Sequence, residues 1–157
     1  MSHQEKRRSS LAKRNFWNAG TRIRSAEIFL SQKDWSDAIR EGKEAIDFIS
    51  QALLFFSGIE RNRFQRPGPM LLSSRKKIPF PENTDWQRLE RLLEEAPSDQ
   101  EASPFGGADF MTFGEPFTSG SASPSTSEDA QKLLDDVRYL EKICRYILRA
   151  EESGQHE

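Results

Sequence analysis

The stretch WSDAIREGKEAIDFISQALLFFSG, residues 35–58, decides the fold of this chain. Its apolar side chains recur every three or four residues, a spacing that places them on one face of a helix. They form two adjacent stripes, the first with Trp35, Ala38, Ile39, Gly42, Ala45, Ile46, Ile49, Leu53 and Phe56, and the second with Phe48, Ala52 and Phe55. One neighbouring helix cannot cover so wide an arc. The stretch therefore predicts a central helix, packed between two helices of its own chain or between one of them and a second subunit.

Three further segments have helical periodicity, at about residues 11–30, 84–96 and 127–151. The first contains Gly20, which costs about 1 kcal/mol relative to alanine inside a helix. The last begins at about Ser127, and two pairs before and within it, Ser125 with Glu128 and Thr126 with Asp129, fit the pattern typical of a helix start. Its apolar residues alternate three and four positions apart, as in near-antiparallel packing. We therefore predict an all-α fold, an antiparallel four-helix bundle.

The remaining segments predict the domain organisation. Residues 11–152 form one domain, between a flexible N-terminal tail (1–10) and a C-terminal tail (153–157). Several prolines make residues 59–81 an irregular connection. In residues 97–126, Gly, Pro, Ser and Thr supply 17 of 30 positions, which predicts a long flexible acidic loop before the last helix. Its four phenylalanines indicate that part of it docks on the bundle or on a partner.

Composition excludes several classes of protein. Hydrophobic residues make up 35% of the chain, and no apolar run reaches the roughly 18 residues that span a bilayer, so no membrane contact is predicted. The charged N-terminus leads into no signal-peptide core, and the single cysteine, Cys144, suits a reducing compartment, so we expect a cytoplasmic protein. The sequence contains no metal-ligand cluster and no glycine-rich phosphate loop, so it predicts neither a metal site nor a cofactor.

Charge is distributed unevenly along the chain. Residues 1–91 carry 18 Lys and Arg against 11 Asp and Glu, a net +7, and residues 92–157 carry 5 against 14, a net −9. Such polarity is typical of proteins that contact nucleic acid or an acidic partner. It is equally consistent with two segments of one fold that neutralise each other.

Residues 35–60 also carry a recognisable pattern of short motifs. After the turn that ends at Trp35 come an Ala-Ile pair at 38–39, Glu-Ala-Ile at 44–46, Ala-Leu at 52–53 and Gly-Ile-Glu at 58–60. This pattern resembles the first half of a HEPN domain, and the helix that opens Thr-Ser-Glu-Asp-Ala at 126–130 is similar to that family's final helix. The resemblance implies an all-helical bundle that usually dimerises. It also implies a relation to metal-independent ribonucleases, many of them toxins paired with a nucleotidyltransferase-like antitoxin.

The ribonucleases of that family use an arginine followed by a histidine after their second helix. A near-neutral imidazole can serve there as general acid or base, while the arginine balances phosphate charge. In this chain the connection reads RNRFQRPGPMLL over residues 61–72, with arginines but no histidine, and the only histidines are His3 and His156. No catalytic residue is therefore assigned, and we expect a nuclease-dead protein.

A basic group remains in this connection and the residues that follow it, comprising Arg61, Arg63, Arg66, Arg75, Lys76 and Lys77. These residues are candidates for binding RNA or another phosphate-bearing ligand. The alternative is a solvated segment that neutralises the acidic loop.

Three functions follow from these features. The first is a non-catalytic, HEPN-like homodimeric protein that binds a nucleotidyltransferase-like partner or RNA. The second is a HEPN-type ribonuclease of a toxin–antitoxin pair that works without the usual histidine. The third is a purely structural subunit of a larger assembly.

Overall fold

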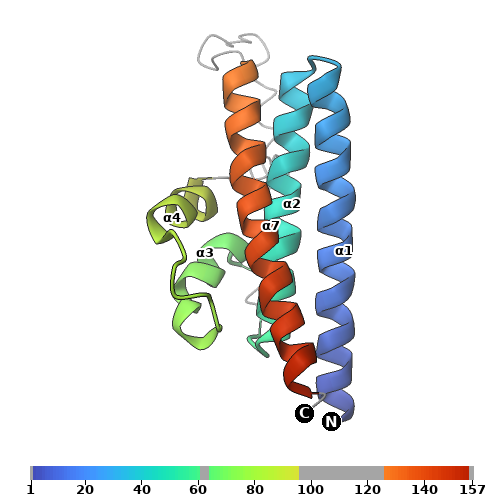
Figure 1. Cartoon of the computed structure of the whole chain (residues 1–157), viewed down its shortest axis with the longest axis vertical. Helices are drawn as coiled ribbons and strands as arrows, with labels where there is room; N and C mark the ends of the chain where they lie inside the picture. The colour runs from blue at the N-terminus through green and yellow to red at the C-terminus, as the bar shows by residue number, and fades with distance from the viewer. Residues whose placement is uncertain (1, 61–63, 96–125, 156–157) are drawn as a thin grey trace.

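The computed structural model describes residues 2–60, 64–95 and 126–155. Within these ranges the chain is helical and contains no strand, so the predicted all-α class is confirmed. Three long helices lie side by side, and two short ones flank them (Figure 1). The long helices are α1 (His3–Ser31), α2 (Trp35–Phe56) and α7 (Ser127–Gln155), and the short ones are α3 (Pro67–Ser73) and α4 (Trp86–Glu95), with a 3₁₀ turn η1 (Arg75–Lys77) between them.

Helix α2 is the centre of the fold, as its double stripe predicts. It contacts α1, α3 and α7, and its Ile46, Ile49 and Leu53 are almost completely buried. Phe48 and Phe56 pack against the same core. Helices of the same chain therefore cover most of both stripes, while Trp35, Ile39 and Phe55 stay half-buried. The homodimer stays a prediction without support from this surface.

The predicted antiparallel arrangement is not confirmed, because α2 and α7 run in the same direction (Figure 1). Gly42, early in α2, lies against Leu133, early in α7, whereas Arg138 of α7 pairs with Glu27 near the end of α1. Helix α1 is thus antiparallel to both of its long neighbours. A heptad-like pattern on α7 fits either direction, so the sequence alone could not distinguish them.

Helix α1 begins at His3, so residues 3–10 are helical where the sequence predicted a tail. The side-chain oxygen of Ser2 accepts a hydrogen bond from the Glu5 backbone N–H at 3.1 Å and caps the helix. Most of this first stretch is exposed and charged, so it has no apolar periodicity to reveal it. At the other end α7 continues to Gln155, beyond the expected start of the C-terminal tail.

The proline-rich connection contains a helix that the sequence analysis missed. Pro67 occupies the first turn of α3, where a missing N–H costs nothing. Gly68 is buried against α4, and a Cβ there would lie 2.6 Å from the carbonyl oxygen of Leu93. The prolines therefore begin a helix, and the glycine allows α3 and α4 to approach closely.

The expected start of the last helix is confirmed. The Asp129 N–H donates to the Thr126 hydroxyl at 3.1 Å, and the Thr126 N–H donates to the Asp129 carboxylate at 3.4 Å. The predicted flexible loop over residues 97–126 lies outside the described residues except for Thr126, so the predicted docking of its phenylalanines lies outside them too. Among the described residues, no helix combines the length and the hydropathy needed to cross a bilayer.

Candidate nucleic-acid interface

A basic stripe runs along the outer side of α1. Its residues recur every three or four positions, which places them on one face of the helix, opposite the buried residues Ala12, Ala19 and Ala26. We call this face the α1 stripe, and its members are Arg7, Ser10, Arg14, Trp17, Thr21 and Arg24. All of them are exposed except Thr21, which is half-buried. The stripe thus presents its side chains to solvent.

The positive charge of the stripe is not neutralised by its neighbours. Residues 6–26 contain seven Lys and Arg and no Asp or Glu. Within the described part of the chain, Lys6, Arg7, Arg14 and Arg24 form no ion pair. Arginines that pair with acidic side chains lie off this stripe, such as Arg22 on another face of α1 and Arg138 on α7. Part of the positive charge of the first half of the sequence is therefore exposed on α1. The acidic residues of the segment 97–125 lie outside the described residues, so neutralisation by them stays a prediction.

Trp17 lies in the middle of this basic face, and 66% of its surface is exposed. Arg14 precedes it by one turn and Arg24 follows it by two. An exposed aromatic ring among cations is typical of surfaces that bind nucleic acids, where the cations contact phosphates and the ring stacks on a base. This stripe was not predicted from the sequence, although the run of basic residues without an acidic one over residues 6–26 indicates a positively charged surface.

A partly buried polar contact joins α1 to α2. The Arg22 guanidinium contacts both Glu41 and Glu44 of α2, each at 3.1 Å. Only 8% of the Glu41 side chain is exposed, so this contact lies inside the α1–α2 interface. Arg22 lies at the edge of the buried face of α1, and with the buried residues Ala12, Ala19 and Ala26 it turns the stripe toward solvent.

The basic residues predicted from the sequence do not form a comparable surface. Arg61 and Arg63 lie outside the described residues. Arg66 donates to the carbonyl oxygen of Glu94 at 3.1 Å, at the end of α4. Arg75 pairs with Glu90 at 2.8 Å and lies over the Trp86 ring, 5.0 Å from its centroid. Arg66 and Arg75 thus connect the α3 region to α4.

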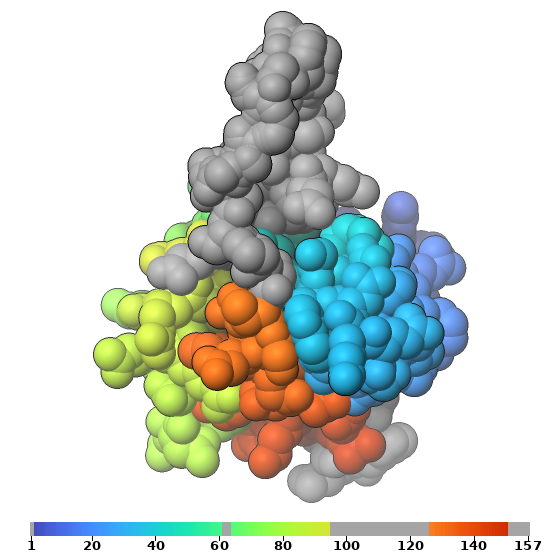
Figure 2. All heavy atoms as spheres, turned by 90° about the horizontal axis from the view of Figure 1, so that it is seen from above, coloured from blue at the N-terminus to red at the C-terminus, as the bar shows by residue number. Residues whose placement is uncertain are grey.

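Lys76 and Lys77 are the exposed remainder of that group. A hollow of about 600 Å³ between α3 and α4 is lined by Lys76 and Arg75, but also by Glu90 and Glu94. Its charges balance, which does not favour a polyanion. Two views place this region and α1 on opposite sides of α2 and α7 (Figures 1 and 2). The two basic regions are therefore separate surfaces.

His3 does not lie in a tail but in the first turn of α1. It is exposed, at the end of the long helices where α2 also ends (Figure 1). The Arg8 side chain lies against Gly58, which places the start of α1 beside the end of α2. His156 lies outside the described residues. His3 thus lies at the same end of the bundle as Gly58, shortly before the arginine-bearing connection of residues 61–72 begins. This position was not predicted from the sequence.

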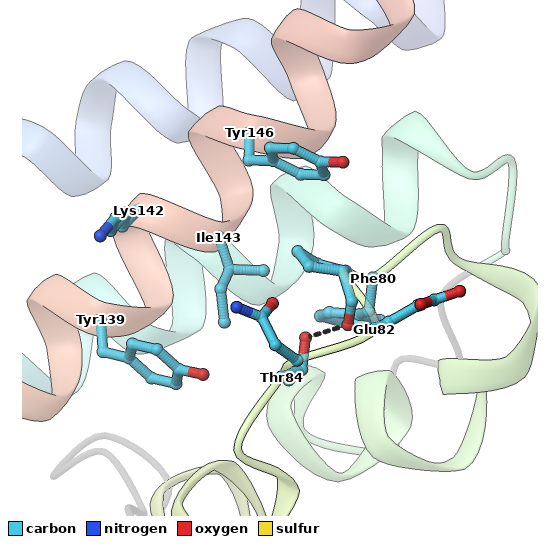
Figure 3. A pocket seen from close by; sticks show the side chains of 9 residues that line it. Phe80, Glu82, Thr84, Tyr139, Lys142, Ile143 and Tyr146 are labelled. Carbon is cyan, nitrogen blue, oxygen red and sulfur yellow. Dashed lines mark hydrogen bonds between the residues drawn. The ribbon is translucent and has the colours of Figure 1, made fainter.

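A hollow of about 750 Å³ lies between α7 and residues 80–84 (Figure 3). Tyr139, Ile143 and Tyr146 extend from α7 toward this connection, whereas Lys142 points away from it. The Tyr139 hydroxyl accepts a hydrogen bond from the Asp85 N–H at 2.8 Å, so this tyrosine anchors the connection. The hollow is lined by apolar and polar side chains and by two of opposite charge, Glu82 and Lys142, so its charge does not favour a phosphate.

Cys144 is buried on α7, as its position on the apolar seam predicts. Burial raises the pKa of its thiol, because a thiolate would lose its hydration there. A nucleophilic role would need the opposite shift. Within the described ranges, no group of three or more His, Cys, Asp or Glu side chains is placed to hold a metal ion.

Comparisons with protein families, with curated proteins and with solved structures find no match to this chain.

Proposed function

We propose that this protein binds RNA through the α1 stripe and does not cleave it. The observation that carries the proposal is a continuous exposed helical face with Arg7, Arg14 and Arg24, none of them in an ion pair among the described residues, around an exposed Trp17. RNA complements this face, because its phosphates can contact the arginines and its bases can stack on the Trp17 ring. The resemblance to HEPN domains agrees with RNA as the ligand.

The expected salt dependence of the affinity follows from the number of cations that can contact phosphates. With Lys6, four positive side chains are available for phosphates. For a single strand the logarithm of affinity falls with the logarithm of salt concentration with a slope of roughly −0.7 per contact, hence about −3 here. Affinity should then drop about 50-fold between roughly 50 and 200 mM salt. Binding of this kind is moderate and strongly salt-dependent.

The test is a titration of labelled RNA at several salt concentrations with a charge-reversal variant, Arg7→Glu, Arg14→Glu and Arg24→Glu combined. Exposed substitutions of this kind usually change stability by less than about 0.5 kcal/mol each. Loss of three contacts should reduce the magnitude of the salt slope by about 2. A thermal melt confirms that the variant still folds.

A matched control carries the same change of net charge on the opposite side of the molecule. It combines Lys76→Glu, Lys77→Glu and Arg91→Glu, three exposed positions on η1 and α4. We expect this control to retain most of the affinity and the slope. If it loses as much as the stripe variant, overall charge or the α3 region determines binding. If the wild type binds no RNA even at low salt, the proposal is wrong.

The other expected partners stay proposals. A nucleotidyltransferase-like protein would have to use a different surface, because the stripe has the chemistry for a polyanion. The alternative of a ribonuclease gains one specific observation, the helical position of His3 beside the end of α2. An RNA-cleavage assay with His3→Ala decides between that alternative and a binding protein.

A further inference from the structure

The surroundings of Trp17 are open on one side. Side chains on a helix lean toward its N-terminus, so the indole covers the turn that contains Lys13 and Arg14. For the same reason, the side chain at position 20 would cover the C-terminal flank of the indole. Position 20 is a glycine, so of the two residues that follow Trp17 by one turn only Thr21 carries a side chain there, and Thr21 is small.

Gly20 also leaves room for a ligand. A Cβ built on it would meet only one neighbouring atom, Nη1 of Arg24 at 3.6 Å. The other terminal nitrogen of Arg24 donates to the Thr21 hydroxyl at 3.3 Å, and that hydroxyl donates to the Trp17 carbonyl oxygen at 3.3 Å. These contacts hold the Arg24 guanidinium beside Gly20 and Thr21, one turn after Trp17. An aromatic face, an empty position and a cation thus adjoin on one exposed surface.

We infer that Trp17 and Gly20 form a stacking platform for one unpaired base, and that Arg24 contacts the neighbouring phosphate. This inference rests on the proposed function and narrows its ligand to single-stranded nucleic acid. In a duplex the faces of the bases are covered by their neighbours, so the indole would have no ring to stack on.

The first test compares Trp17→Leu with Trp17→Phe. The probes are labelled RNA and DNA single strands and an RNA duplex, each of about 20 residues, longer than typical single-strand sites. Stacking on an aromatic side chain is worth roughly 5- to 150-fold in affinity, so the leucine variant should lose that much for single strands. Phenylalanine should recover part of it, because it keeps a ring. Affinity for the duplex should stay unchanged in both variants.

The second test uses the glycine. Gly20→Ala and Gly20→Leu both improve helix propensity, so neither should unfold the protein. A methyl group fits beside Arg24 and leaves the indole mostly open, whereas a leucine side chain covers its flank. We expect the leucine variant to melt no lower than wild type and still lose affinity for single strands. The alanine variant should keep most of it.

The outcomes separate the platform from the proposed function. Salt-dependent binding of single strand and duplex alike, unaffected by Trp17→Leu, would overturn the platform and leave the stripe as a phosphate-binding surface. Binding to anionic vesicles or polyglutamate, with none to any nucleic acid, would overturn both. Equal affinity for the RNA and DNA strands would assign recognition to bases and phosphates, and preference for RNA would add a contact with the 2′-hydroxyl. Either result supports the platform.

Discussion

Replacing Gly68 by alanine should destabilise the protein, although alanine is the better helix former. A Cβ at this position would lie 2.6 Å from the Leu93 carbonyl oxygen and 3.4 Å from its carbon. These are backbone atoms of α4, so relief requires that α3 and α4 move apart. Overpacking of this kind costs about 1–3 kcal/mol, against a gain of at most about 1 kcal/mol in helix propensity. We expect a net loss of about 1–2 kcal/mol in the free energy of unfolding.

The matched control is the same substitution at Gly20, where the added methyl group meets only the end of the Arg24 side chain at 3.6 Å. It should stabilise by up to about 1 kcal/mol. For a chain of this size each kcal/mol shifts Tm by roughly 2–4 °C, so thermal unfolding followed by circular dichroism should show shifts of opposite sign. If Gly68→Ala melts at or above the wild-type Tm, the close contact between α3 and α4 is not as we describe it.

Three further predictions follow from the described contacts. Arg22→Met should lower the free energy of unfolding, measured in urea, by about 2 kcal/mol, because it leaves the buried Glu41 carboxylate without its main cation. Adding Glu41→Gln should restore part of this loss, and an unchanged urea midpoint in Arg22→Met would contradict the role of this pair. Tyr139→Phe removes the acceptor of the Asp85 N–H and should cost about 1 kcal/mol, with faster hydrogen exchange at that amide. Purified protein should leave RNA intact, because residues 61–72 contain no histidine for general acid–base catalysis, which raises the rate of such reactions by roughly 10²- to 10⁴-fold. Cleavage that disappears in His3→Ala would contradict this prediction.

The sequence predicted those parts of the fold in which apolar periodicity and packing agree. Helix α2 lies within the stretch 35–58 that predicted it, and α7 begins at Ser127 after Thr126, one of the two expected caps. The direction of α7 relative to α2 could not be predicted. It depends on where residues 57–126 lead the chain, and an apolar seam reads the same in either direction.

The basic surface was missed for a related reason. Apolar periodicity distinguishes buried from exposed positions on a helix, but it does not distinguish among the exposed ones. Arg7, Arg14 and Arg24 therefore contributed to the prediction only through the net charge of the segment. Conversely, Arg66 and Arg75 were singled out as neighbours in sequence, although their contacts with Glu94 and Glu90 depend on the folded position of α4. Whether a charged residue is available to a ligand therefore depends on which side chains the fold places next to it.

The parallel course of α2 and α7 has a consequence for the order of folding. Only residues 32–34 separate α1 from α2, whereas about 70 residues separate the end of α2 from the start of α7. The entropy of closing a loop grows with its length, and on this basis bringing α7 back costs about 3 kcal/mol more than closing the α1–α2 hairpin. We therefore expect the hairpin to form first and α7 to dock later. The surface that we assign to RNA belongs to the early hairpin, so it would already face solvent before the core is complete.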